Sequence, residues 1–254
     1  MKIDDIKKLH QKKYRAEFGY YLVEGEHLIL ELEKAADTQP SLQGAQLFVT
    51  ENYQYWQTRF DKTLVTERQM QQMSDTKSPQ GIVAVVPIPR TKNLACTVSS
   101  VSPDSNTDRK SRPERAIYLF ETQDPGNLGT ILRTLAWFGG FRCLLSPNSV
   151  DPYNPKVVRA SMGAIFHLPL ELDVELTDLR QRYARIAYLD MKGEAIGHKS
   201  FADFQCFLFG NEARGVPEQA RQALNAQGFT IPGTGIVESL NLASAVNICA
   251  YQLS

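Results

Sequence analysis

The C-terminal half of the chain alternates continuous apolar runs with longer segments of helical periodicity, and turn residues separate the two kinds of segment. Such apolar runs are typical of strands buried on both faces, and intervening helices favour a mostly parallel sheet covered on both sides. We therefore predict an α/β fold. The predicted strands are residues 116–120, 142–145, 185–189, 204–209 and 228–231, and the predicted helices are residues 127–138, 155–162, 176–183, 217–226 and 239–252.

The N-terminal part has a weaker version of the same pattern. Segments with helical periodicity alternate with short strand-like runs, and Pro87 and Pro89 end the last run because proline cannot continue a strand ladder. This pattern predicts a small α/β domain. The predicted helices here are residues 4–12 and 25–36, and the predicted strands are residues 46–50 and 81–86.

A polar segment separates the two patterns. Residues 97–115 contain almost no apolar side chains and are rich in serine, aspartate and proline, which is typical of a solvated linker. The sequence therefore predicts an N-terminal domain over residues 1–96, a flexible linker over residues 97–115 and a second domain over residues 116–254.

Composition excludes several classes of protein. The 254 residues, 43% of them hydrophobic, accommodate one large or two modest domains. Because no apolar run approaches the roughly 20 residues that span a bilayer and the polar start lacks a secretion signal, we expect a cytoplasmic protein without a membrane anchor. The cysteines and histidines lack ligand spacing, so we expect no disulfide scaffold and no metal. They are Cys96, Cys143, Cys206, Cys249, His10, His27, His167 and His198.

Charge alone does not indicate a nucleic-acid partner. The chain has 28 basic and 28 acidic residues, so its global balance lacks the basic excess of many nucleic-acid-binding domains. Two local basic clusters remain, and a solvated helix face explains the first as well as RNA does. The clusters are Lys7, Lys8, Lys12, Lys13 and Arg15, and Arg109, Lys110, Arg112 and Arg115.

Three predicted strand-to-helix loops are polar and rich in glycine. Ligands of parallel sheets bind outside the carboxyl ends of the strands, where these loops lie. In the first loop, Asn127 is expected to cap the following helix, and Arg133 lies about two turns into it. An ordinary exposed arginine on an amphipathic helix explains Arg133 equally well.

The second loop follows an apolar strand directly. Its glycines, Gly210 and Gly215, allow a ligand to approach the backbone, whereas a structural turn alone does not require the adjacent Asn211 and Glu212. In the third loop, over residues 230–247, Ser239 or Asn241 could cap a helix, but capping explains one polar residue and not the whole run.

Together these segments resemble the three motifs of the SpoU (TrmH-like) branch of the SPOUT superfamily of methyltransferases. The matching patterns are N-L-G-x-x-x-R at Asn127–Arg133, G-N-E-x-x-G at Gly210–Gly215, and I-P…E-S-L-N at Ile231–Asn241, in the family's order and spacing. Residues 159–169 also resemble a family segment. Residues 13–25 and 78–84 resemble the small RNA-binding domain that many members carry at the N-terminus.

The resemblance implies a C-terminal domain with a deep trefoil knot that binds S-adenosylmethionine and methylates a ribose 2′-hydroxyl. It implies RNA as the partner, ribosomal in preference to transfer RNA, and a homodimer that completes the active site. The motif positions assign cofactor binding to Gly210, Asn211, Gly215, Ile231 and Leu240, and catalysis to Arg133 with Asn127, Glu212, Ser239 and Asn241.

The chain departs from the family pattern at two positions. Ala213 stands where a glycine is common, and Leu135 stands where the family often has alanine. Neither change removes a polar group, so we expect specificity or packing to be affected and not the reaction type. Two other functions stay open, namely an RNA-binding protein of this fold without turnover and a methyltransferase directed at a base.

Overall fold

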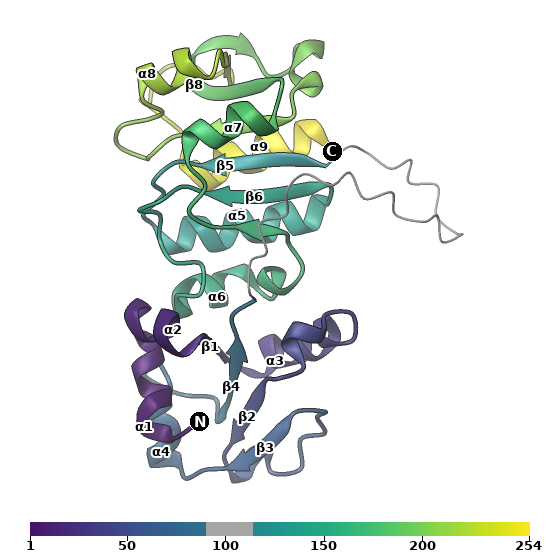
Figure 1. Cartoon of the computed structure of the whole chain (residues 1–254), viewed down its shortest axis with the longest axis vertical. Helices are drawn as coiled ribbons and strands as arrows, with labels where there is room; N and C mark the ends of the chain where they lie inside the picture. Colours follow the sequence, from purple (N-terminus) through teal and green to yellow (C-terminus); the bar gives the residue numbers. More distant parts are fainter. Residues whose placement is uncertain (90–113) are drawn as a thin grey trace, which may run out of the picture. The chain divides into compact units, whose positions relative to one another are not determined.

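The computed structural model of the chain describes residues 1–89 and 114–254, which form two compact units (Figure 1). The described part of the first unit is residues 1–89, 124–133 and 150–167, and that of the second is residues 114–123, 134–149 and 168–254. Most of the predicted linker, residues 97–113, lies outside the described residues, as do Cys96, Arg109, Lys110 and Arg112.

The second unit contains a six-stranded sheet in the order β10-β8-β9-β5-β6-β7, and all of its strand pairs are parallel. The predicted parallel α/β sheet is therefore confirmed. Each of the five predicted strands is present, and the two-residue β7 is an addition that is too short to give a hydrophobic pattern. The strands are β5 (Arg115–Leu119), β6 (Phe141–Leu145), β7 (Leu170–Glu171), β8 (Ile186–Ala195), β9 (Cys206–Phe209) and β10 (Gln227–Thr230).

Helices cover both faces of this sheet within the second unit. On one face, Tyr118 of β5 packs in a buried cluster with Leu179 of α7 (Leu176–Arg182) and with Leu224, which follows α8 (Glu218–Ala223). On the other face lie α9 (Leu242–Leu253) and the end of α5 (Pro125–Phe138) (Figure 1). Because successive side chains of a strand point to opposite faces, a strand buried on both must be apolar throughout.

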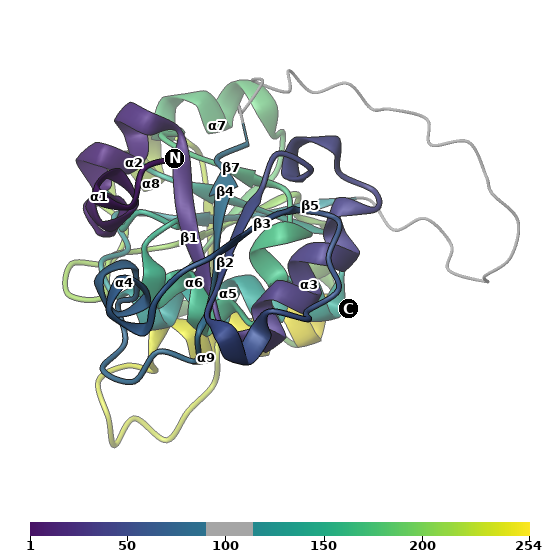
Figure 2. The same cartoon turned by 90° about the horizontal axis from the view of Figure 1, so that it is seen from below.

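The first unit contains a four-stranded sheet in the order β1-β4-β2-β3, in which β2 and β3 are parallel and the other pairs antiparallel. Figure 2 shows α1, α2 and α4 on one side of this sheet and α3 on the other. The predicted small α/β domain is thus confirmed. Its elements are α1 (Ile3–Ile6), α2 (Lys12–Phe18), β1 (Tyr20–Glu24), α3 (Glu26–Ala36), β2 (Gln46–Val49), β3 (Asp61–Leu64), α4 (Glu67–Met73) and β4 (Ile82–Pro87), and α6 (Pro155–Ser161) belongs to the same unit.

Local structure differs from the prediction in this unit, where α2, β1, β3 and α4 were not predicted. The single helix predicted over residues 4–12 is wrong, because Gln11 has an extended backbone (φ −100°, ψ 133°) and α2 begins after it. Strand β3 was not predicted, since its side chains are all exposed and include Asp61, Lys62 and Thr63, so no polar–apolar alternation marks it.

Arg15 is the most deeply buried charge of the first unit's N-terminal segment, with 2% of its surface exposed. Its Nε and Nη2 atoms donate to Asp151 Oδ2 at 2.8 and 2.6 Å, and Nη1 donates to the carbonyl oxygen of Leu9 at 2.7 Å. Arg15 therefore does not belong to an exposed basic cluster, which corrects the sequence-based grouping. Its guanidinium ties the start of the chain to the segment that precedes α6.

Replacement of Arg15 by leucine is expected to lower the free energy of unfolding by about 3 kcal/mol, because the Asp151 carboxylate, which is only 11% exposed, loses its counter-charge. Urea unfolding of the two proteins measures the difference. The double variant Arg15→Leu/Asp151→Leu should recover part of the loss. Lys34→Leu, which removes an exposed ion pair with Glu31, should change the midpoint little. Equal midpoints for Arg15→Leu and the wild type would contradict the assignment.

Candidate functional site

The strands that precede the three motif loops end at one edge of the six-stranded sheet. Leu119, the last residue of β5, pairs with Phe209 at the end of β9 and with Leu145 at the end of β6. The loops that follow these adjacent parallel strands therefore begin at the same level. The loop after β10 leaves the same edge of the sheet, because β10 is parallel to its neighbour β8.

Glu121 joins the loops that follow β5, β6 and β9. Its carbonyl oxygen accepts a hydrogen bond from Asn211 Nδ2 at 2.8 Å, and its carboxylate pairs with Arg214 Nη2 at 2.5 Å. Its backbone N–H donates to Ser146 Oγ at 2.7 Å. Glu121 also has a positive φ of 47°, which is uncommon for a residue with a Cβ. Sequence reasoning missed Glu121, Arg214 and Ser146; the position of Glu121 two residues beyond the end of β5 was the available signal.

Asn211 shapes the second loop from inside. Only 8% of the residue is exposed, and its Oδ1 atom accepts from the backbone N–H groups of Ala213 at 3.0 Å and Arg214 at 3.3 Å. The N–H of Gly215 donates to the carbonyl oxygen of Asn211 at 2.8 Å and closes the loop. The side chain of Asn211 is thus occupied in holding the loop, and its contact with a cofactor stays a prediction.

Gly210 is required by close backbone approach within that loop. A Cβ atom at this position would lie 2.1 Å from the carbonyl carbon of Gly215 and 2.4 Å from the N atom of Val216. Gly215 itself has a φ of 66°, which favours glycine. Gly210 therefore lets two backbone segments of the loop lie against each other, whereas the space at the Cβ position of Gly215 is open. Glu212, between them in the sequence, is exposed.

The third loop is open to solvent. Ile231 is half-buried just beyond β10, whereas residues 232–241 are exposed, including Ser239 and Leu240 (47% exposed). Helix α9 begins at Leu242, because Asn241 Oδ1 accepts from the N–H groups of Ala243 at 2.9 Å and Ser244 at 3.3 Å. The predicted start at residue 239 is therefore wrong, and Ser239 belongs to the loop.

Helix α5 holds the two remaining predicted site residues. It begins at Pro125, and Asp124 Oδ1 accepts from the N–H of Asn127 at 2.7 Å. Asp124 is thus the capping residue, and the predicted cap by Asn127 is wrong. Leu128, Ile131, Leu132 and Leu135 are buried, and Arg133 is exposed between them. Asn127 and Arg133 belong to the first compact unit, whereas the other predicted site residues belong to the second.

Other chemistries find little support in the part of the chain that the structure describes. Burial raises the pKa of the Cys143 and Cys249 thiols to about 12, and it raises that of Cys206 further, so these cysteines are not thiolate nucleophiles at neutral pH. Within residues 1–89 and 114–254, no cluster of three histidine, cysteine or carboxylate side chains could bind a metal ion. No described helix has both the length and the apolar character to cross a bilayer.

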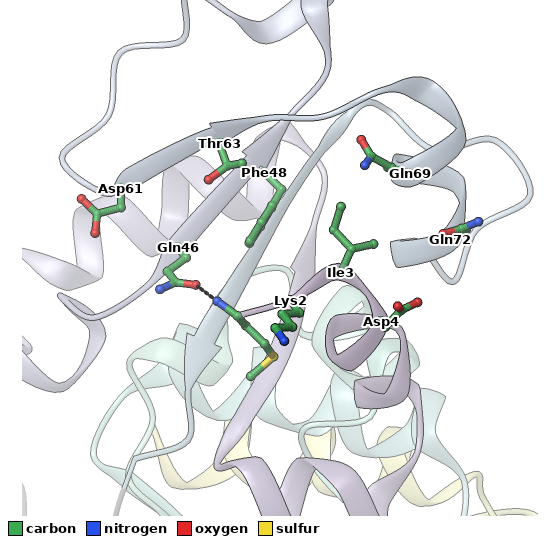
Figure 3. A pocket seen from close by; sticks show the side chains of 10 residues that line it. Lys2, Ile3, Asp4, Gln46, Phe48, Asp61, Thr63, Gln69 and Gln72 are labelled. Carbon is green, nitrogen blue, oxygen red and sulfur yellow. Dashed lines mark hydrogen bonds between the residues drawn. The ribbon is translucent and has the colours of Figure 1, made fainter.

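A hollow of about 660 Å³ in the first unit lies between α1, β2, β3 and α4. Figure 3 shows that Gln46, on its wall, accepts a hydrogen bond from the N-terminal amino group, at 2.9 Å. None of the predicted site residues lines this hollow, so it is separate from the three loops. Its lining is Met1, Lys2, Ile3, Asp4, Gln46, Phe48, Asp61, Thr63, Gln69 and Gln72.

Comparison with known families divides the chain in two. Residues 114–251 match the SpoU rRNA Methylase family, and residues 1–84 match the MRM3-like substrate binding domain. The first match covers all three motif loops.

Individual relatives share both parts. The chain is 29% identical to the 23S rRNA (guanosine(2553)-2′-O)-methyltransferase RlmP of Bacillus subtilis over 259 aligned residues, which cover 99% of this chain and 95% of that protein. The fold of this chain is similar to that of a putative TrmH-family RNA methyltransferase from Porphyromonas gingivalis, with a TM-score of 0.77 and 26% identity. The match covers 99% of this chain and 96% of that one. The fold is also similar to that of an AdoMet-bound rRNA methyltransferase from Sinorhizobium meliloti (TM-score 0.76, 25% identity, 99% and 93% coverage).

Gly210→Ala is expected to lower the free energy of unfolding by about 1–3 kcal/mol, because the new methyl group would overlap the backbone at Gly215. Binding of S-adenosylmethionine, which the sequence predicts at this loop, should be lost with it. Urea unfolding and calorimetric titration measure the two effects. Gly197→Ala is the matched control, since a Cβ there meets nothing within 4 Å. Identical behaviour of the two variants would overturn this role of Gly210.

Proposed function

The chain belongs to the SpoU rRNA methylase family and is an S-adenosylmethionine-dependent RNA methyltransferase, and we propose that its acceptor is a ribose 2′-hydroxyl of ribosomal RNA. The observation that carries the proposal is the set of loops joined at Glu121, which contains the second motif intact and lies at the ligand-binding edge of the sheet. The family's deep trefoil knot is part of the same proposal.

The second loop fits the cofactor. Nothing lies within 4 Å of the position that a Cβ would take at the exposed Gly215, so the backbone there is open, and we infer that backbone groups of Gly210 and Gly215 hold the cofactor. Ile231 and Leu240 supply apolar surface beside it. When bound, the cofactor supplies an electrophilic methyl group. The protein's residues must then align the acceptor hydroxyl with that methyl group and accommodate the proton that leaves.

Arg133 is the residue proposed to act on the acceptor. A guanidinium stays protonated at neutral pH, so Arg133 cannot readily take up the hydroxyl proton. It can anchor an RNA phosphate or stabilise the alkoxide that develops as the proton leaves. The exposure of Arg133 on α5 supports either role, because RNA can reach it. Asn127, Glu212, Ser239 and Asn241 are proposed to orient Arg133, the ribose or the loops.

We propose a homodimer through α5 and α9. Thr134 of α5 hydrogen-bonds to Asn247 of α9, and the rings of Phe138 and Tyr251 lie 6.2 Å apart, so the two helices pack side by side. On their outer face, 85% of Trp137 and 72% of Tyr251 are exposed. Large exposed aromatic side chains of this kind favour an interface with a second copy.

The domain match at residues 1–84 supports RNA recognition by the N-terminal part. The cytoplasmic location predicted from the sequence is also part of the proposal. The domain boundaries at residues 96 and 116 also stay a prediction. The two alternatives, binding without turnover and methylation of a base, are separated from the proposal by the first experiment below.

The enzyme is expected to transfer labelled methyl from S-adenosylmethionine to ribosomal RNA, and Arg133→Ala should slow transfer at least about 100-fold with cofactor affinity mostly kept. Scintillation counting and nucleoside analysis measure transfer, and calorimetry measures affinity. Arg68→Ala, at an exposed helical position of the first unit, is the control. A base-methylated product without ribose methylation would contradict the 2′-hydroxyl assignment, and cofactor binding without any transfer would favour the binding-protein alternative.

Trp137→Glu is expected to convert the dimer into monomers and to reduce transfer, because it places a charge in the proposed interface. Sedimentation velocity measures the oligomeric state. Tyr55→Glu changes a comparably exposed aromatic residue of the first unit and should leave the dimer intact. A monomeric wild-type enzyme, or a variant that dimerises as the wild type does, would refute this interface.

A further inference from the structure

Helix α2 has a basic exposed face, and contacts on its opposite face fix the orientation of the helix. Arg15 points inward to Asp151 and to the carbonyl oxygen of Leu9, and Tyr14 and Phe18 are half-buried beside it. The opposite face of the helix consists of exposed residues, among them Lys12 and Lys13. Because Arg15 holds one side of α2 against Asp151 and Leu9, Lys12 and Lys13 lie on its exposed side. Figure 2 shows α2 beside the four-stranded sheet.

Aromatic rings lie beside Lys13 of this face and beside Lys8, which precedes α2. The rings of Tyr14 and Phe18 are stacked, with centroids 5.8 Å apart and an interplanar angle of 29°. The Nζ atom of Lys13 lies 5.6 Å from the Tyr14 centroid, and that of Lys8 lies 5.8 and 6.0 Å from the two rings. Cation–π contacts hold ammonium groups in place and leave their outer N–H groups available to an anion.

The charges of this segment are unequally neutralised. Lys7 pairs with Asp4 and Lys8 with Asp5, each at 2.8 Å, whereas Lys12 and Lys13 form no ion pair within residues 1–89 and 114–254. Glu17 is the carboxylate on the exposed face of α2. A local positive excess therefore remains at this helix although the whole chain has a formal charge of zero.

We propose that the basic face of α2, defined as Lys12 and Lys13 with the ring of Tyr14, is a docking surface for the phosphate backbone of the substrate RNA. The proposal rests on the proposed function. No large apolar side chain of α2 is among the exposed ones, which disfavours a lipid surface as the partner. Lysines contact phosphates without reading bases, so this surface strengthens binding and leaves the choice of nucleotide to other residues.

The charge-reversal variant Lys12→Glu/Lys13→Glu tests the proposal. Its affinity for ribosomal RNA at 0.1 M salt should fall on the order of 10- to 100-fold, and the slope of log affinity against log salt should become shallower by about 2, one per phosphate contact. In the transfer assay KM for RNA should rise, with kcat and cofactor affinity unchanged. Filter binding over a salt series and steady-state kinetics measure these quantities.

The Glu17→Gln variant should change RNA affinity in the opposite direction, and misfolding cannot strengthen binding. Removal of this carboxylate should strengthen RNA binding, by roughly threefold at 0.1 M salt. Lys192→Glu/Lys199→Glu makes the same change in net charge at exposed positions of the second unit and should leave the RNA salt slope unchanged.

The outcomes separate this surface from the proposed function. An unchanged affinity and slope in Lys12→Glu/Lys13→Glu would overturn the docking surface while wild-type transfer leaves the function standing. A wild type that binds RNA but transfers no methyl, with the slope still lost in the variant, would overturn the function and keep the surface. A wild type that binds no RNA would refute both, and a fall in kcat with unchanged affinity would refute the surface.

Discussion

The hydrogen bond from the Asn211 side chain to the carbonyl oxygen of Glu121 is the contact on which the candidate site depends. It joins the loops after β5 and β9, two strands that end in register. The ion pair between Arg214 and the carboxylate of Glu121 reinforces this connection. Asn211 is buried, so a lost partner would leave a polar group unsatisfied. The strain of a positive φ at Glu121 is acceptable because several bonds hold that residue.

The charged side chains of this protein differ in their surroundings from one place to another. The formal balance of zero conceals one arginine that is buried in an ion pair, lysines that are paired with nearby aspartates, and two lysines on α2 that are left unpaired within the described ranges. A global charge therefore says little about an RNA partner, since steering and docking depend on where charges gather on the surface. The burial of Arg15 and the exposure of Lys12 and Lys13 are consequences of the same helix orientation.

Several large apolar side chains are exposed in the single chain, at segments proposed to bind the cofactor or a second copy. The third motif loop has exposed Ile236, Val237 and Leu240, and the α5–α9 face has exposed Trp137 and Tyr251. Both lie in the second unit, which also holds the loops at Glu121. A cofactor and a second copy of the chain would each remove apolar surface of this kind from water.

The sequence by itself determined the parallel sheet, because strands buried on both faces must be apolar throughout. It also determined the motif loops, because their glycine and polar residues follow the order and spacing of the family's motifs. It could not predict β3, whose exposed side chains have no alternation, or the cap of α5, since Asp124 and Asn127 are both capping residues and only backbone geometry chooses between them. The roles of Glu121 and Arg15 were decided by tertiary structure alone. Their partners lie 90 and 136 residues away, and no local pattern encodes such a contact.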